Sequence, residues 1–294
     1  MSPLRGPLMM VASMAAFAAE DAMIKALAAR VPAGQIGLVL GLGGTLVFWA
    51  LIRARGGRLF VAAGLKGAAL VRNLAEMTAA MCMILSVALV PLSVVSAILQ
   101  AMPLTVTMGA ALVLGEPVGW RRWSAILVGF AGVLMILRPG SEGFDQLALL
   151  PLGAVLALTV RDIATKRLDP GISSLQVSGW GFFAVVPGGL LLLAIRGEGP
   201  VLPGALDAML LGLTMTVGIL GYGALVLATR VGAIAATTPF RYSRLVFALI
   251  IGVVVFGERP DAMTLGGSAL VVGAGLYALL REMRLRRLSV RTAR

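Results

Sequence analysis

Ionisable side chains interrupt several otherwise apolar stretches of this chain. Residues 9–29 read MMVASMAAFAAEDAMIKALAA and include Glu20, Asp21 and Lys25. A charged group near the centre of a bilayer costs about 2.5–3.5 kcal/mol, so such groups usually face a protein interior or a water-filled cavity. The other ionisable residues in apolar stretches are Arg72, Glu76, Arg161, Asp162, Lys166, Arg241 and Arg244. Groups of this kind can bind charged solutes or exchange protons.

Three acid–base pairs among these residues are spaced four positions apart. They are Asp21 with Lys25, Arg72 with Glu76, and Asp162 with Lys166. One helical turn brings such partners together on the same face of a helix. We interpret the first and last pairs as structural ion pairs that fix helix positions. For the middle pair two interpretations stand, a structural ion pair or part of a binding site.

The remaining charges do not balance within their own stretches. Residues 9–29 contain no second base to match Glu20, and the stretch with Arg241 and Arg244 contains no acid. We therefore hypothesise that Arg241 or Arg244 holds the carboxylate of a zwitterionic solute, while Glu20 or Glu76 faces its amine. The same two acids are candidates for proton exchange.

The composition indicates a membrane protein without catalytic groups. Of the 294 residues 59% are hydrophobic and 13% are charged, whereas soluble domains have about 25% charged residues. The chain has no histidine and one cysteine, Cys82, so we expect no disulfide, no metal site and no cofactor. The acids lie dispersed and are mostly matched by bases. A membrane-embedded enzyme is therefore the least favoured function, and we assign no catalytic residue.

Ten stretches approach the length of about 20 apolar residues that a helix needs to cross a bilayer. They are residues 5–29, 34–52, 67–89, 92–114, 123–138, 146–167, 172–195, 207–229, 233–256 and 262–280. Their connections are short and leave no room for a soluble domain. The sequence therefore predicts an all-α integral membrane protein with ten transmembrane helices.

The basic residues indicate the orientation of these helices. Most of the 25 Lys and Arg residues fall in the connections on one side, together with both termini. Because such residues accumulate on cytoplasmic loops, we expect the N and C termini to be cytoplasmic. The net charge of +12 is then a topology signal rather than a sign of nucleic-acid binding. The basic tail, residues 283–294, is expected to meet the headgroups of membrane lipids.

Two motifs of the first half return in the second half. AEDAMIKAL (residues 19–27) aligns with VRDIATKRL (160–168), and VLGEPVGWRR (113–122) aligns with VFGERPDAMT (255–264) at nearly the same offset. This predicts two homologous repeats of five helices, residues 1–140 and 146–282. It also favours retention of the first helix over its removal as a signal peptide. Since five is odd, the second repeat crosses the membrane in the inverted sense, as in many secondary transporters.

Two of the predicted helices contain a proline. Pro103 and Pro239 each remove one backbone hydrogen bond and kink their helix, and we interpret both as hinges, with a static kink as the alternative. Gln100 and Tyr242 align across the repeat and offer a hydrogen-bonding group about one turn from each proline. The other side chains expected to line a cavity are Met77, Met81, Met102, Trp180 and Tyr222.

The repeated motifs carry a family resemblance. The segments LGEPVGWRRWSAILVGFAGVLMI and FGERPDAMTLGGSALVVGAGL, with the Asp-x-x-x-Lys segments of the first and sixth helices, resemble the EamA-type members of the drug/metabolite transporter superfamily. Within it, size and pattern are similar to the aromatic amino acid and paraquat exporters of the YddG type. The resemblance extends over essentially the whole chain.

This resemblance implies a transporter of the bacterial inner membrane. It would export aromatic and other neutral amino acids, and related small metabolites, by alternating access through a midplane cavity. The chain lacks a phosphate-binding GxxxxGK[ST] loop, which excludes its own ATP drive; proton-coupled and facilitative transport both stay open. An exporter of lipophilic cations such as paraquat is the alternative. The expected partners are a small-molecule substrate and membrane lipid, and a homodimer is left open.

Overall fold

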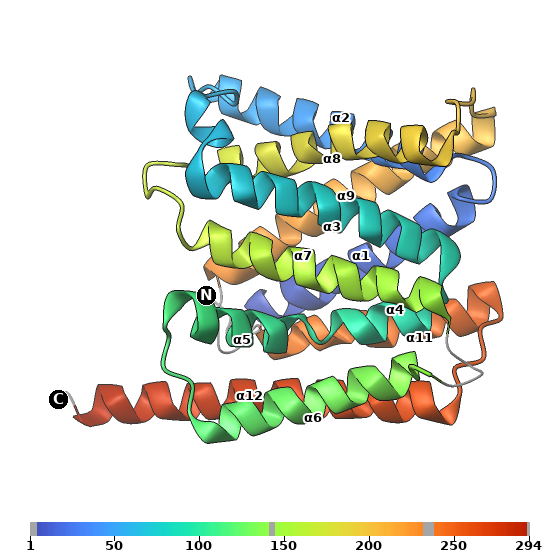
Figure 1. Cartoon of the computed structure of the whole chain (residues 1–294). Coiled ribbons are helices and arrows are strands. Elements are labelled where there is room, and N and C mark those ends of the chain that lie inside the picture. Colours follow the sequence, from blue (N-terminus) through green and yellow to red (C-terminus); the bar gives the residue numbers. More distant parts are fainter. Residues whose placement is uncertain (1–4, 141–144, 232–237, 293–294) are drawn as a thin grey trace. The chain divides into compact units, whose positions relative to one another are not determined.

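The computed structural model describes residues 5–140, 145–231 and 238–292, and every regular element in these residues is a helix (Figure 1). Ten helical stretches among them are long and apolar enough to cross a membrane, which confirms the ten predicted spans. The α-helices are α1 (Arg5–Leu27), α2 (Ala33–Ala54), α3 (Gly67–Leu89), α4 (Leu92–Leu99), α5 (Met102–Leu114), α6 (Trp120–Leu137), α7 (Leu149–Thr165), α8 (Ser174–Arg196), α9 (Ala205–Val231), α11 (Ser243–Phe256) and α12 (Ala262–Thr292). Three short 3-10 helices are η1 (Ala62–Leu65), η2 (Gln146–Ala148) and η3 (Thr238–Tyr242).

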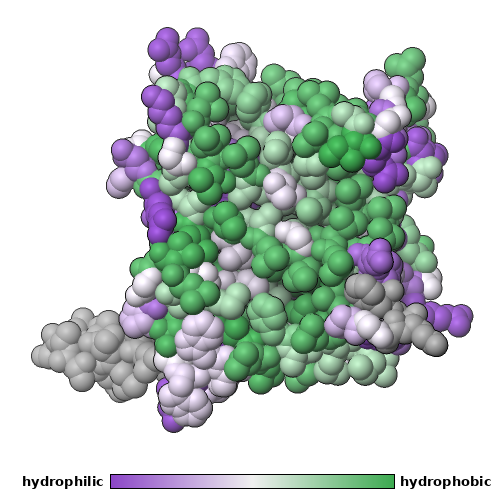
Figure 2. All heavy atoms as spheres, viewed as in Figure 1, coloured by the Kyte–Doolittle hydropathy of each residue, from purple (hydrophilic) through white to green (hydrophobic). Residues whose placement is uncertain are grey.

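The outward side chains of these helices are apolar. Leu46, Leu127 and Ile195 are each more than three-fifths exposed, and in Figure 2 hydrophobic residues cover most of the helical surface in view. Hydrophilic side chains gather near the helix ends in the same view. A surface of this kind is suited to lipid, because backbone polar groups are satisfied within helices and side chains meet hydrocarbon. The protein is therefore a multi-pass membrane protein.

The described chain divides into two compact units by its contacts. Unit 1 comprises α4, α5, α6, α11 and α12, with α1 up to Ala19 and α9 from Leu220 onward. Unit 2 comprises α2, α3, α7 and α8, with α1 from Glu20 and α9 up to Ile219. Each unit draws helices from both halves of the sequence, so the units do not coincide with the predicted repeats. The repeat boundaries stay a prediction.

Unit 2 is held together by close contact between α2 and α8, which lie side by side (Figure 1). At Gly34 and Gly189 the two backbones touch, since a Cβ on Gly189 would lie 2.6 Å from the Gly34 carbonyl oxygen. Small residues permit this kind of approach in membrane proteins. The helices α3 and α7 pack against each other in the same unit.

Unit 1 has an equivalent contact between α6 and α12. A Cβ on Gly132 would lie 2.7 Å from the carbonyl oxygen of Gly267. Arg138, just after α6, forms an ion pair with Asp261, just before α12. Hydrogen bonds from the Arg138 guanidinium and the Thr264 backbone N–H lower the pKa of Asp261 to about 2. The pair links the ends of two neighbouring helices outside the membrane-spanning segments.

Helix α12 continues past its apolar part. The span that could cross a membrane ends at Arg281, but the helix runs on to Thr292. The predicted basic tail, residues 283–294, therefore begins as a continuation of α12 as far as its described part reaches.

Candidate functional site

The predicted fourth span is two helices rather than one kinked helix. Helix α4 ends at Leu99 because Pro103 has no N–H to bond the Leu99 carbonyl. Gln100 and Ala101 instead bond carbonyls three residues back, Gln100 N to Ala97 O at 3.2 Å and Ala101 N to Ile98 O at 3.0 Å. Helix α5 then begins at Met102, with the proline in its first turn, where a missing N–H is tolerated.

The proline of the ninth predicted span also lies outside an α-helix. The described part of this span starts with the 3-10 helix η3, which contains Pro239, and α11 begins at Ser243. Tyr242, the residue that aligns with Gln100, stands directly before α11. Residues 233–237 of the predicted span lie outside the described residues. The structure thus corrects the prediction of one kinked helix for the fourth span, whereas for the ninth span it describes only the part from Thr238 onward.

The far ends of the two segments also match. Helix α5 ends at Gly115 with φ 68°, and α11 ends at Gly257 with φ 65°. This left-handed conformation is open to glycine without steric cost, and it terminates a helix. The two segments, of 13 and 14 residues, therefore end in the same way, as the aligned Gly-Glu motifs predict.

Buried polar side chains lie beside these interruptions in unit 1. Ser96 is 1%, Gln100 7% and Tyr242 8% exposed. The hydroxyl groups of Ser96 and Tyr242 have no hydrogen-bond partner among the described residues. Helix α4, which carries Ser96 and is followed directly by Gln100, packs against α11 and α12. Buried polar groups are normally hydrogen-bonded, so these hydroxyls are candidates for contact with a ligand or water.

The surroundings of Tyr242 hold its ring in one place. Its phenol group points to Gly275 of α12, where a side chain would collide with it. Two residues on, the guanidinium of Arg244 lies 5.4 Å from the ring centroid of Phe17 on α1, a cation–π contact.

Tyr222 on α9, another predicted lining residue, is half-buried. It follows Gly221, whose carbonyl accepts a 2.7 Å hydrogen bond from Ser13.

A charge cluster occupies the interior of unit 2. Glu76 Oε2 accepts from Arg72 Nη2 at 2.8 Å, as their spacing predicts, and Glu76 Oε1 faces Arg161 Nη1 at 3.3 Å. The Glu76 side chain is 18% exposed and that of Arg72 is 7% exposed. The Arg161–Glu76 contact joins α7 to α3. Both carboxylate oxygens are thus engaged, which leaves Glu76 poorly placed to meet a substrate amine.

One residue of each of two predicted ion pairs contacts a further group in the structure. Asp162 pairs with the neighbouring Arg161 at 2.8 Å. Lys25 Nζ donates a 2.8 Å hydrogen bond to the carbonyl of Val90, directly after α3. A cation at the C-terminus of a helix is stabilised by the unpaired carbonyls there. Lys25 thereby links α1 to α3, and Lys166 is exposed at the end of α7.

Glu20 and Asp21 lie on the same turn of α1. Asp21 is 4% exposed. The carboxylate of Glu20 lies against Gly218 of α9, where any side chain would collide with it. Within unit 2, Glu20 therefore faces α9. The role of either acid in binding stays a prediction.

The remaining predicted lining residues are Trp180 and three methionines, and their surroundings differ. Trp180 is 4% exposed and packs with Ile52, Leu59 and Ala69, while its Nε1 donates a 2.7 Å hydrogen bond to the Leu59 carbonyl. This is a packing role and not the wall of an adaptable cavity, because the ring is enclosed and its N–H is used. Met77 and Met81 pack on Gly188 of α8, and Met102 is half-buried at the start of α5.

Comparison with known proteins places the chain among membrane transport proteins. The model of the EamA-like transporter family matches residues 4–138 and 147–280. The chain belongs to this family. Two matched segments in one chain fit the two-repeat architecture of this EamA-like protein. A solved crystal structure of a protein with 20% identity has a TM-score of 0.62 over 95% of this chain and 99% of that chain, which supports the fold.

Several curated relatives of this EamA-like protein have named substrates. The riboflavin transporter of Rhizobium johnstonii is 32% identical over 67% of this chain and 65% of its own length. The S-adenosylmethionine uptake transporter of Rickettsia prowazekii is 26% identical over 65% of this chain and 64% of its own length. The chain thus spans just under two thirds of these two relatives. The pseudopaline exporter CntI of Pseudomonas aeruginosa is 27% identical over 92% of this chain and 94% of its own.

Sequence reasoning recognised the Gly-Glu motif but missed its function in this EamA-like fold. Glu258 caps the N-terminus of α4: its Oε1 accepts from Leu92 N at 2.6 Å, and its Oε2 accepts from Ser93 N at 3.0 Å and Ser93 Oγ at 2.8 Å. An acid at a helix N-terminus satisfies unpaired N–H groups and meets the positive end of the helix dipole. The sequence feature that could have pointed to this role is the recurrence of the Gly-Glu motif in both halves.

We expect Glu258→Ala to loosen α4 selectively. Loss of a helix cap costs about 1–2 kcal/mol, so amides of Leu92–Leu99 should exchange with deuterium faster in the purified variant. Ser93→Ala removes one of the three contacts and should give a smaller increase. Unchanged exchange in α4 with Glu258→Ala would show that the cap does not hold this helix.

Proposed function

We propose that the protein is a secondary transporter that exports a small amino-acid-like metabolite by alternating access. The observation that carries this proposal is the break between α4 and α5 at Pro103, together with the 3-10 helix that contains Pro239 and the buried polar groups beside both prolines. Non-helical backbone at membrane depth is tolerated where it is enclosed in protein or lines a cavity. In secondary transporters such interrupted helices form the substrate and ion sites.

Membership of the EamA-like family supports transport, and the relatives support the size of the solute. Riboflavin, S-adenosylmethionine and pseudopaline are small polar metabolites, and S-adenosylmethionine is an amino acid derivative. We place the protein in the bacterial inner membrane with both termini in the cytoplasm, on the charge bias of the loops. Its conformational change would use the interruptions at Pro103 and Pro239 as hinges.

Within this proposal the substrate lies against the interrupted helices. Gln100 and Tyr242 would hydrogen-bond it, and Arg241 or Arg244 would hold its carboxylate. Of the two acids predicted to meet an amine, Glu76 is engaged by two arginines, so only Glu20 stays a candidate. An exporter of lipophilic cations, with Glu20 as the counter-charge, is the alternative function.

Transport by purified protein in liposomes tests the proposal. Labelled neutral amino acids, S-adenosylmethionine, riboflavin and paraquat would be offered with and without a pH gradient. We expect saturable uptake of an amino-acid-like solute. Transport of paraquat without any amino-acid-like solute would favour the alternative, and no transport of any solute would count against the proposal.

The variants Tyr242→Phe and Gln100→Leu should each lower the transport rate about tenfold at low substrate concentration. Each removes one hydrogen bond to a substrate in a site shielded from water, where such a bond contributes about 1–1.5 kcal/mol. Thr216→Val is a matched control, because this exposed hydroxyl only bonds back to Gly212 O of its own helix at 2.8 Å. Wild-type rates in both variants, at equal protein content, would remove these residues from the site.

A further inference from the structure

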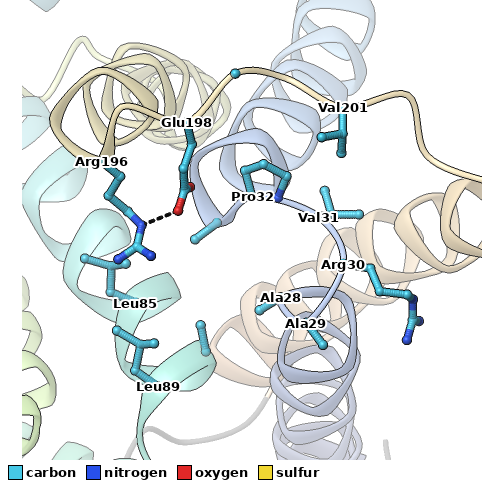
Figure 3. Close-up of a pocket in the computed structure, with 13 residues that line it drawn as sticks. Ala28, Ala29, Arg30, Val31, Pro32, Leu85, Leu89, Arg196, Glu198 and Val201 are labelled. Carbon is cyan, nitrogen blue, oxygen red and sulfur yellow. Dashed lines mark hydrogen bonds and ion pairs between the residues drawn. The ribbon is translucent and has the colours of Figure 1, made fainter.

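Unit 2 contains a cavity of about 400 Å³ that is not part of the proposed transport site (Figure 3). It is lined by the α1–α2 turn, the last turn of α3 and the α8–α9 connection. All of these segments belong to unit 2, whereas the interrupted helices belong to unit 1. On the predicted topology the cavity opens on the extracytoplasmic side.

Three helices end at this cavity. Ala28 and Ala29 directly follow α1, Leu89 is the last residue of α3, and Arg196 is the last residue of α8. The C-terminus of a helix carries about half a negative charge, because its last carbonyls have no intrahelical partner. Lys25 offsets part of this charge at α3 through its bond to the Val90 carbonyl. The ends of α1 and α8 leave a local environment that favours a cationic group.

Two opposite charges stand together in the cavity wall. Arg196 Nε donates a 2.6 Å hydrogen bond to Glu198 Oε1, the bond drawn in Figure 3. The second carboxylate oxygen of Glu198 is buried and has no hydrogen-bond partner among the described residues. The Arg196 side chain is 43% exposed, and that contact uses only its Nε. The terminal N–H groups of Arg196 are therefore open to an anionic oxygen, while Oε2 of Glu198 can accept from a cationic donor.

The other charge of the wall is already engaged. Arg30 pairs with Asp207 of α9 at 2.8 Å. The rest of the lining is apolar or small, with Leu85 and Leu89 on one side and Val31 and Pro32 on the other (Figure 3). Polar recognition is thus concentrated at Arg196 and Glu198, with room for a short apolar group beside them.

We propose that this cavity binds a small zwitterion, with its anionic group on the terminal nitrogens of Arg196 and its ammonium group toward Glu198 and the helix ends. The apolar part of the ligand lies against Leu85 and Leu89. A lone anion would meet the three helix C-termini, and a lone cation would meet Arg196, so a molecule with both charges fits best. Two sources share this chemistry, a free amino acid and the phosphoethanolamine headgroup of a lipid. The site is independent of the transport proposal.

Calorimetric titration of the full-length protein in detergent tests the site, with L-leucine and O-phosphoethanolamine as probes. We expect saturable binding of at least one probe, and about tenfold weaker binding in Arg196→Gln and in Glu198→Gln, because each loses a charge-assisted hydrogen bond. Gly199→Phe tests the cavity itself, since Gly199 lines it and a Cβ there meets nothing within 4 Å. This variant should fold normally and lose binding.

Arg138→Gln is the matched control, because it also breaks an Arg–carboxylate pair at a helix end but lies in unit 1. It should bind both probes like the wild type. Tighter binding of L-leucine assigns the site to free amino acids. Tighter binding of O-phosphoethanolamine, with thermal stabilisation in nanodiscs of phosphatidylethanolamine but not of phosphatidylglycerol, assigns it to lipid. Absence of binding of either probe to the wild type, or undiminished binding in Gly199→Phe, would overturn the proposal.

Discussion

The variant Glu76→Gln should unfold at a markedly lower denaturant concentration than the wild type. Its carboxylate lies between Arg72 and Arg161 in the interior of unit 2. Without the negative charge two guanidinium groups face each other in a membrane-embedded interior. Breaking a buried pair in this way costs about 3–5 kcal/mol, and we expect about 3 because the Glu76 side chain keeps 18% exposure. This loss of stability can be measured by unfolding the purified protein in detergent with increasing amounts of dodecyl sulfate.

A second substitution separates this structural effect from a binding role. Glu76→Gln combined with Arg161→Gln leaves Arg72 and Asp162 as one positive and one negative charge. The double variant should therefore be more stable than the sum of the two single effects predicts. If Glu76→Gln keeps wild-type stability and abolishes transport, Glu76 is a substrate contact instead.

The variant Gly189→Val should separate α2 from α8. A Cβ at this position would lie 2.6 Å from the Gly34 carbonyl oxygen and 2.9 Å from the Leu38 backbone nitrogen. Both neighbours are backbone atoms, which can move only if a whole helix moves. Overpacking of this kind costs about 1–3 kcal/mol, and more where the backbone must shift. We expect a lower thermal midpoint and a lower yield of monodisperse protein.

Gly273→Val controls for the helix propensity of valine. Gly273 also lies within a helix, α12, but is exposed and has nothing within 4 Å of a Cβ. It should fold like the wild type. Equal thermal midpoints for the two variants would show that the Gly34–Gly189 contact does not limit the stability of unit 2.

Charge spacing predicted contacts within one helix better than contacts between helices. Arg72 and Glu76 are paired as expected, because residues four apart share a face of any α-helix. The second partner of Glu76 is Arg161, which is far away in sequence and comes close only because α7 packs on α3. Asp162 pairs with that same arginine, a contact that the four-residue spacing to Lys166 did not predict.

The position of Pro103 predicted where the fourth span is disturbed but not how. Pro103 lacks an N–H in any conformation, and a disturbed helix follows from that alone. Whether the chain kinks or restarts depends on what satisfies the freed groups, and neighbouring helices decide this. The buried hydroxyls of Ser96 and Tyr242 are likewise a tertiary result, since no pattern marks Ser96 in the sequence.

The sequence by itself determined the ten spans, the family and the recurrence of two motifs. These properties follow from local composition and from residues a few positions apart. The tertiary structure decided which charges meet, which glycines touch a backbone and where the cavity of Arg196 and Glu198 lies. Its two units mix helices from both halves of the sequence, so these contacts join distant segments, such as Glu76 with Arg161, 85 residues apart, and Leu92 with Glu258, 166 residues apart. Such contacts depend on helix packing, which the apolar pattern of a membrane helix does not specify because lipid and protein interior are equally apolar.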